Sequence, residues 1–511
     1  MPVQRHVIKR QILQVGVPRA QDAHTLSAEM SRVYRQRILP LIDRYCTELS
    51  APDRLHRIEL LEVDLGTVDA HNLEEEVIAK VSPALRQALA ARIRAQEQAD
   101  ASSDRAPITR SQLELLAYFA RTGSLPWWAD RAQPTLLDAC LQHLLAKAPD
   151  ALHRLLKQFT QEPHSLRRII RQFNDEQLAR LAGLLVPQLE ATCVRDATTW
   201  LMLLQASQVA LSSSRVQVRY GFWHTVLSVA GISGWHYGTQ ESWYRAVLKR
   251  VAVKMGVLYD ALVADIQRLV QADGANVSPA FKALWDGVMR HHSHETSGVV
   301  DASDEQVSHS LGLRLTPAKQ VEPQEKQELT SRAPSAPDLD SHFSDADELS
   351  IDNAGLVVLW PFLSHFFAHV GLLEEKHFKD AAAQQRAVGL LQYLATGDAS
   401  FLEYLLPLNK VLCGMEVTEV FDFGAPLAEA ETEECGNLLH AVIAQVPILR
   451  NMTPTGFRGS FLLRRGMLST RDGAWLLRVK RETYDVVLDR FPWTIQWVKL
   501  PWMEAPLRVE W

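Results

Sequence analysis

AGLVVLWPFLSHFFAHVGLL, residues 354–373, runs for twenty positions without an Asp, Glu, Lys or Arg. A helix that rises about 1.5 Å per residue needs roughly 20 residues to cross a hydrocarbon core of about 30 Å. The stretch is therefore long enough to span a membrane. Its surroundings must decide between a membrane protein and a chain with an unusually apolar buried element.

The residues in and around this stretch favour burial inside a protein. Pro361, His365 and His369 would be costly in hydrocarbon, and Asn353 can cap an ordinary helix. Acidic residues flank both ends, where a span favours Lys and Arg on its cytoplasmic side. They are Asp347, Glu348, Asp352, Glu374 and Glu375. We expect a buried opening of a C-terminal domain and no membrane partner.

Composition sets further limits on the chain. At 511 residues, a prior of roughly 150 residues per domain gives about three domains. The net charge of −6 comes without a clustered basic face, so we expect no nucleic-acid partner. The five cysteines are odd in number and far apart, which favours buried or free thiols over a disulfide framework. They are Cys46, Cys140, Cys193, Cys413 and Cys435.

The first hundred residues predict a β-α-β-α unit. Residues 6–17 and 56–66 are apolar and β-branched, as strands are, and a slip in parity within 56–66 predicts a β-bulge. Helical periodicity follows each of them, and we expect Ser82-Pro83 to split the second helix. The N-terminus has no signal-peptide core, so we expect the chain to stay in the cytoplasm when it is made.

The middle of the chain predicts short amphipathic helices and then a linker. Five segments between residues 111 and 187 carry apolar positions three or four apart, typical of an irregular or solenoid-like helical region. Residues 301–350 hold eleven acidic and four basic residues and four prolines, which is typical of a disordered linker.

The last third starts helical and ends as sheet. Residues 386–397 and 435–449 predict helices, and Asp472-Gly473 between two apolar runs predicts a hairpin. YDVVLDR (484–490), WTIQWVKL (493–500) and LRVEW (507–511) continue the strands. The fold class is thus α+β and mostly α, ending in a small antiparallel sheet, with domains at 1–100, 101–300, a linker at 301–350, and 351–511.

Three sets of polar residues are candidates for chemistry. For His291, His292, His294 and Glu295 we favour a solvated polar turn over a zinc site, which needs ligands on rigid elements. Asp485 and Asp489 on a strand would lie roughly 13 Å apart, too far for a carboxylate pair, so we read them as surface or turn-capping residues.

His365 and His369 lie four apart on one helical face, and we favour the polar edge of a packed helix over a pair of ligands. No nucleotide-binding loop, metalloprotease or serine-hydrolase motif occurs in the sequence. We therefore expect no enzyme and assign no catalytic, cofactor-binding or metal residues.

Several blocks of sequence follow one another in a fixed order at the two ends of the chain. The N-terminal blocks are residues 6–15, 56–68 and 113–129, and the C-terminal ones are 353–363, 386–397, 406–414, 459–468, 484–493 and 498–511. Together these blocks resemble the tape measure proteins of phage-tail-like contractile injection systems, and the resemblance covers around half of the chain.

The resemblance implies a structural protein that sets how far an inner tube polymerises and nucleates tube assembly at the baseplate. Its implied partners are the inner-tube, baseplate hub or spike, and tube-cap proteins, with possible self-association in the tube lumen. It implies a chain that acts in the cytoplasm of the producing cell and then resides inside the particle. The alternatives are a baseplate or lumen scaffold or plug without ruler function, and a metallohydrolase built on the histidine cluster.

Overall fold

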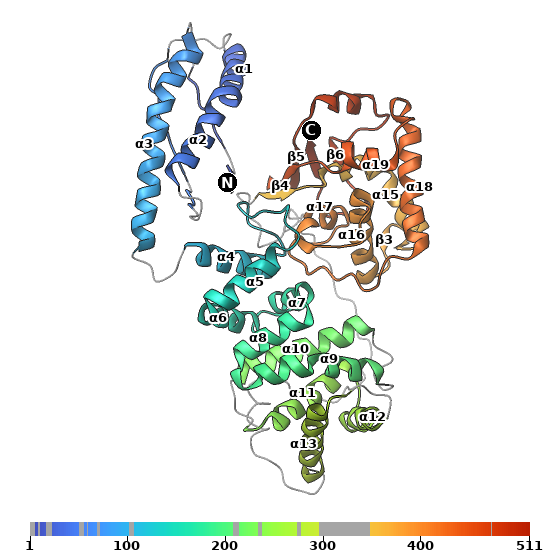
Figure 1. The fold of residues 1–511 in the computed structure, drawn as a ribbon. Coiled ribbons are helices and arrows are strands. Elements are labelled where there is room, and N and C mark those ends of the chain that lie inside the picture. The colour runs from blue at the N-terminus through green and yellow to red at the C-terminus, as the bar shows by residue number, and fades with distance from the viewer. Residues whose placement is uncertain are drawn as a thin grey trace, which may run out of the picture. The chain divides into compact units, whose positions relative to one another are not determined.

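The computed structural model describes residues 6–8, 11–16, 23–50, 56–58, 60–68, 72–101, 107–207, 214–233, 238–272, 277–295, 348–471 and 473–511. It divides into two compact units. One holds residues 1–119 and 125–152, and the other holds residues 120–124 and 153–511. Figure 1 shows that the described elements are mostly helices, with strands at the C-terminal end.

The two helices predicted for the first hundred residues are found in the first unit. The first is a continuous helical segment of 27 residues that contains one π-helical turn. The next helix has 29 residues. Pro83 lies inside that second helix and does not split it, contrary to our prediction. The elements are α1 (Ala23–Val33), η2 (Tyr34–Ile38), α2 (Leu39–Leu49), α3 (Leu73–Ala101), α4 (Pro107–Thr122) and α5 (Leu136–Lys147).

The core of this unit lies between α1–α2 and α3. Val33 and Val77 are almost completely buried, and Tyr45 Oη lies 2.6 Å from Ser82 Oγ. Ile58, Leu61, Val63 and other side chains of the segment 56–68 pack on this core. The described residues of 6–16 and 56–68 form no strand ladder, so the two predicted strands and the bulge are not found there.

The second unit begins with the predicted string of short helices. Polar residues start several of them, and Asn174 with Gln177 forms a complete capping box at the start of α8. The elements are α6 (Pro149–Phe159), α7 (Pro163–Gln172), α8 (Asp175–Leu185), η4 (Pro187–Leu189), α9 (Glu190–Ala206), α10 (Arg215–Ser233), α11 (Gln240–Met255), α12 (Tyr259–Gln271) and α13 (Pro279–Glu295).

Aromatic rings fill the core of α9, α11 and α13. The ring centroid of Trp200 lies 5.1 Å from that of Tyr244, 4.8 Å from that of Phe281 and 5.9 Å from that of Trp285. All four side chains are buried. Edge-to-face and offset pairs add to the burial of such large rings, so this cluster holds the later helices together.

The expected buried opening of the C-terminal domain is confirmed for residues 354–359, which form the 3-10 helix η6 (Ala354–Leu359) and are all buried. The helix α15 (Trp360–His369) follows and buries one face through Leu363, Phe366 and Phe367, whereas Pro361, His365 and His369 are exposed. In the described part of the chain, no helix is both long and apolar enough to cross a membrane.

The remaining helices surround this opening. The predicted helices at 386–397 and 435–449 are found in α16 and in α18 with η8. The elements are α16 (Ala381–Thr396), η7 (Glu403–Leu405), α17 (Pro407–Leu412), α18 (Glu429–Gln445), η8 (Pro447–Leu449), α19 (Pro454–Phe457) and η9 (Arg458–Leu462).

The C-terminal sheet has five strands in the order β1-β4-β5-β7-β6. The predicted hairpin is confirmed as β4 and β5, but β5 pairs with β7 in parallel, so the sheet is mixed and not antiparallel. The strands are β1 (Leu349–Ile351), β4 (Gly466–Arg471), β5 (Ala474–Val479), β6 (Trp497–Val498) and β7 (Leu507–Glu510), and β2 (Leu373–Glu374) pairs with β3 (His377–Phe378) apart from them.

Two further predictions for this region are wrong. The linker was expected to reach residue 350, but Leu349 and Ser350 belong to β1. Residues 484–490 were expected as a strand and instead form most of the 3-10 helix η10 (Thr483–Arg490). Residues 296–347, where the rest of the linker prediction falls, lie outside the described residues.

Buried polar contacts tie distant segments of this domain together. Asn353 donates to Gln392 Oε1 (2.9 Å) and Asn409 Oδ1 (2.7 Å). The indole of Trp493 donates to the carbonyl of Val358 (3.0 Å). Buried groups of this kind are stable only when they are hydrogen-bonded, so these contacts fix the relative positions of the segments.

Two backbone segments approach each other closely in this core at Gly355. A Cβ added there would lie 1.6 Å from the carbonyl oxygen of Phe461, and backbone has little room to move in a packed core. Gly355→Ala should therefore lower the free energy of unfolding by about 3 kcal/mol or more. Chemical denaturation of the purified chain measures it.

Gly436 in α18 is the matched control, because an added Cβ there meets nothing within 4 Å. Gly436→Ala should be neutral or stabilise by roughly 0.5–1 kcal/mol, since alanine favours a helix interior. Equal effects of the two substitutions would contradict the close approach.

Candidate functional site

Arg168 lies at the centre of a buried polar junction between α7 and the C-terminal domain, and every member belongs to the second unit. One face of α7 packs into the helical core through Leu166, Ile169 and Ile170. Arg168 is buried as completely as they are, with an exposed fraction of 0 %. A guanidinium in such a place must have all its donors satisfied.

The acceptors of Arg168 come from three segments. Its Nε donates to Glu403 Oε1 (3.1 Å), and its Nη2 donates to the carbonyl of Thr418. Its Nη1 donates to the carbonyls of Ala120 (3.1 Å) and Arg121 (2.7 Å), in the last turn of α4. Those carbonyls lack helical partners and carry the negative end of the helix dipole, so a cation is well placed there.

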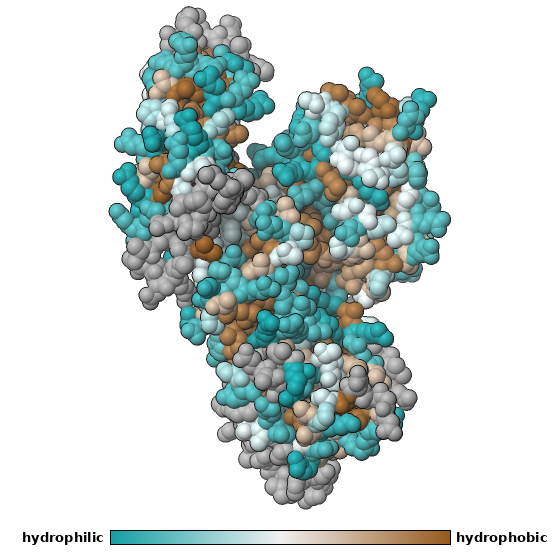
Figure 2. Space-filling view, in the orientation of Figure 1, coloured by the Kyte–Doolittle hydropathy of each residue, from teal (hydrophilic) through white to brown (hydrophobic). Residues whose placement is uncertain are grey.

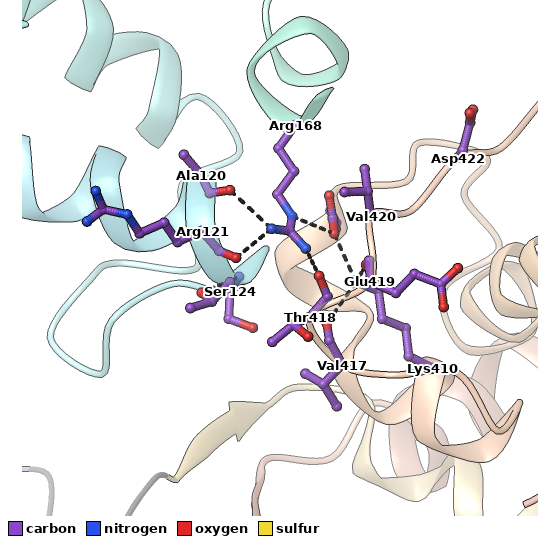
Figure 3. Close-up of polar contacts among 12 residues, drawn as sticks. Ala120, Arg121, Ser124, Arg168, Lys410, Val417, Thr418, Glu419, Val420 and Asp422 are labelled. Carbon is purple, nitrogen blue, oxygen red and sulfur yellow. Dashed lines mark hydrogen bonds and ion pairs between the residues drawn. The ribbon is translucent and has the colours of Figure 1, made fainter. Parts of the chain in front are cut away.

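Lys410 completes the junction from the other side. Its ammonium donates to Glu403 Oε1 (2.9 Å) and to the carbonyls of Val417 (3.0 Å) and Glu419 (2.6 Å). Burial lowers the pKa of Lys410, and the neighbouring Glu403 carboxylate opposes that shift. Figure 3 shows both cations pointing toward the same segment around residues 417–420.

Gly123 makes room for these contacts. Its φ is +72°, and an added Cβ would lie 2.5 Å from Glu403 Oε1 and 2.9 Å from Arg168 Nε. Glycine adopts this left-handed conformation without steric cost. The turn after α4 can therefore approach the ion pair only with glycine at this position.

A second contact beside the junction involves Asp422. Its Oδ2 accepts from Arg167 Nη2 (2.9 Å) and from Arg171 Nη2 (2.5 Å). Gln385 holds the same loop, because its Nε2 donates to the carbonyl of Val420 and its Oε1 accepts from the backbone N–H of Asp422. The Asp422 carboxylate and the Thr418 carbonyl thus join α7 to the loop 417–422.

Cations also surround Tyr220 on α10. The side chains of Arg167, Arg171 and Lys254 lie 5.6, 5.7 and 4.7 Å from its ring centroid. Burial, with Arg167 nearby, lowers the pKa of Lys254 to about 8. Burial, with Lys254 nearby, lowers the pKa of His224 to about 4.

This arrangement suits a structural joint and not catalysis. A catalytic acid, base or nucleophile needs a group that can reach a substrate. Here each donor of Lys410 is used inside the protein, and Glu403 serves both cations. Removing one member would leave a buried charge without its partner, so the junction keeps α7 and the C-terminal domain together.

The candidate residues of the sequence lie elsewhere. The backbone at His291, His292, His294 and Glu295 is helical to the end of α13, so a turn is wrong there, and their side chains lie outside the described part. His365 and His369 have parallel rings 6.2 Å apart, and His369 Nε2 lies 3.6 Å from Glu434. Among the described residues, no group of three or more His, Cys, Asp or Glu is placed to hold a metal.

The prediction that Asp485 lies at the surface is wrong. This residue is buried, and both of its oxygens accept from Arg464 (2.6 and 2.7 Å). It also accepts from the backbone N–H of Glu482 and from the indole of Trp511, so the capping role is confirmed together with a buried ion pair. Asp489 is exposed.

The cysteines behave as expected for thiols without disulfides. All five are free, and four of them are buried. Burial raises the pKa of Cys140, Cys193 and Cys435 to about 12. Thiols of such high pKa are poor nucleophiles, since the thiolate is the reactive form.

Sequence reasoning missed Arg168, Glu403 and Lys410. Arg168 is one of three arginines in a single helix, and nothing local distinguishes it. Lys410 offered a signal, because it is the only charged residue between Leu405 and Gly414. A lone cation in an apolar run must be paired if the run is buried.

The family comparison agrees with the resemblance seen in the sequence. The family model described as contractile injection system tape measure protein matches residues 5–511. The chain belongs to this family. No curated protein and no solved structure matches it. The tape measure family is structural, in keeping with a junction that contains no reactive group.

The match includes the segments that form the junction and the C-terminal core. Gly123 and Lys410 lie in two of the blocks that carried the resemblance, 113–129 and 406–414. Asn353 lies in a third, 353–363, and both Asp485 and Trp493 lie in a fourth, 484–493. Blocks far apart in this tape measure protein therefore meet through buried polar contacts.

Replacing the shared carboxylate should destabilise the tape measure protein strongly. Glu403→Gln leaves Arg168 and Lys410 buried without a negative partner, and breaking a buried pair costs about 3–5 kcal/mol. The free energy of unfolding from chemical denaturation should fall by that amount. Arg180→Gln is the control, because the exposed pair Arg180–Glu176 should contribute no more than about 0.5 kcal/mol.

His224 should make the protein less stable in mild acid. Its pKa is about 4 in the folded chain against 6.5 in the unfolded one, so the unfolded state binds more protons as the pH falls from 6.5 to 4. Stability should fall across that window, by at most roughly 3 kcal/mol from this group. In His224→Gln the unfolding free energy should change less between pH 7 and pH 4.5, and parallel curves for the two proteins would contradict the shift.

Proposed function

We propose that this tape measure protein sets how far the inner tube polymerises before it is capped, and that it nucleates tube assembly at the baseplate. The observation that supports the proposal is the family match over residues 5–511. The partners we propose are the inner-tube, baseplate hub or spike, and tube-cap proteins of the same particle. In the assembled particle the chain would lie in the tube lumen.

A ruler must be long, and no described helix approaches such a length. A fully helical chain of 511 residues would reach on the order of 770 Å, whereas the longest described helix has 29 residues. A ruler function therefore requires the middle helices to be drawn out along the tube. The terminal regions, about 1–100 and 351–511, would then act as anchors.

The middle helices suit such a change. The helices α5 to α13 have ten to nineteen residues each, and isolated helices shorter than about 12–15 residues are marginal in water. They therefore owe much of their stability to packing against one another. The Arg168 junction would have to open as α7 leaves the C-terminal domain, so the compact fold fits a chain that has not yet entered a tube.

Particle length tests the ruler directly. Deletion of residues 130–350 should shorten the particle by roughly 330 Å if that segment is helical in the tube, and duplication should lengthen it by as much. Electron microscopy of particles assembled with each variant measures the change. A particle length that stayed the same in both variants would contradict the ruler function and favour a scaffold or plug.

Two further variants control for misfolding. Duplication of residues 301–347 leaves every described contact in place, and it should lengthen the particle by about 70 Å if helical. Arg168→Met disturbs the junction at constant chain length, so the particles that form should keep the normal length. Labels on the two termini should lie far apart for a ruler and together for a plug.

A further inference from the structure

Two extended apolar segments of the first unit form no strand ladder in the part of the chain that the structure describes. Residues 6–8, 11–16, 56–58 and 60–68 belong to no strand. Among the described residues, their backbones also make no hydrogen bond to another backbone group. The two segments have the sequence pattern of strands, so they present unpaired strand edges.

Side-chain contacts fix the path of the first segment. His6 Nδ1 lies 2.7 Å from Asp43 Oδ1 on α2, and the side chain of Gln11 lies beside Tyr34, where it opposes the burial that raises the pKa of that tyrosine. A residue later in the segment thus contacts a residue earlier in the helices. The described residues of this segment, 6–8 and 11–16, therefore run antiparallel to α1 and α2.

The second segment follows α3 in the same way. The backbone N–H of Arg57 donates to Gln96 Oε1 (3.0 Å), and Lys80 Nζ donates to the carbonyl of Thr67 (2.5 Å). The helices run in the same direction, because Arg32 pairs with Glu74 and Tyr45 with Ser82. Both extended segments therefore run the same way, which is the path of the predicted β-α-β-α unit without its sheet.

Apolar side chains remain exposed along these edges. They belong to both parities of the first segment, so neither of its faces is fully covered. The exposed residues are Val7, Ile8, Ile12, Leu13, Val15 and Leu60, with Ile12 71 % exposed. In Figure 2, brown residues interrupt the teal surface of the part that Figure 1 colours blue. Parallel strands are normally paired and covered on both faces, so this surface is incomplete.

The charges of the two extended segments indicate which partner would pair with each of them. The sequence places Lys9 and Arg10 and no acidic residue in 6–16, whereas 56–66 holds Glu59, Glu62 and Asp64 against Arg57. Opposite charges favour cross-strand pairs and like charges oppose them. A basic strand therefore matches an acidic one, and a second copy of the chain supplies each with its complement.

We propose that residues 6–16 of one copy pair with residues 56–66 of a second copy, and the reverse. Each copy gives and receives a strand, so the contact is two-fold and closes on itself. Backbone hydrogen bonds supply affinity and the charges supply specificity, as in strand addition generally. The proposal does not rest on the ruler function.

Exchanging charges between two chains tests the pairing. Glu62→Lys/Asp64→Lys makes both segments basic, and Lys9→Glu/Arg10→Glu makes both acidic. Each variant alone should be monomeric by light scattering after gel filtration, while the wild type should have about twice the monomer mass of 57.5 kDa. An equimolar mixture of the two variants should recover the dimer, because each basic segment again meets an acidic one.

Other variants separate pairing from misfolding. Gln14→Pro removes a backbone N–H that has no described backbone partner, so it should raise the dimer dissociation constant at least tenfold and leave the circular dichroism spectrum unchanged. Glu374→Lys/Glu433→Lys, in the second unit, makes the same change in net charge as Glu62→Lys/Asp64→Lys and should leave the dimer intact. A wild-type chain that is monomeric at every concentration, or a mixture that stays monomeric while both variants are folded, would overturn the proposal.

Discussion

The second unit depends on one carboxylate that two buried cations share. Glu403 lies between Arg168 and Lys410, and the remaining donors of these cations end on five backbone carbonyls. Removing charges from water is expensive, and only complete pairing and hydrogen bonding offset that cost. The junction therefore requires every segment to be in place together.

That requirement explains several local features of the sequence. The turn after α4 needs glycine at 123, because any side chain would meet the ion pair. The loop 417–422 must present its carbonyls inward, and Gln385 and the two arginines that bind Asp422 hold it in that position. The same logic applies at Asp485, where one carboxylate joins Arg464, a 3-10 helix and the last residue of the chain. Buried polar groups thus define which segments meet.

Local patterns predicted the helices and the hairpin well. Periodicity and caps located α5 to α8, and Asp472-Gly473 located the turn between β4 and β5, because these features depend on neighbours in the sequence. The parallel pairing of β5 with β7 and the burial of Asp485 depend on distant segments, and neither was predicted. Pro83 did not break α3, where packing outweighed one missing hydrogen bond. The candidate site escaped prediction for the same reason, because Arg168 and Glu403 are 235 residues apart.

The position of β1 also has a mechanical consequence. This three-residue strand is at the edge of the sheet and is the first described strand after residue 347. A force that pulls the chain from its N-terminal side would act first on the short ladder between β1 and β4 and then on the buried amide of Asn353. A short edge ladder separates at a lower force than a central one. The C-terminal domain would therefore lengthen in small steps before its core begins to unfold.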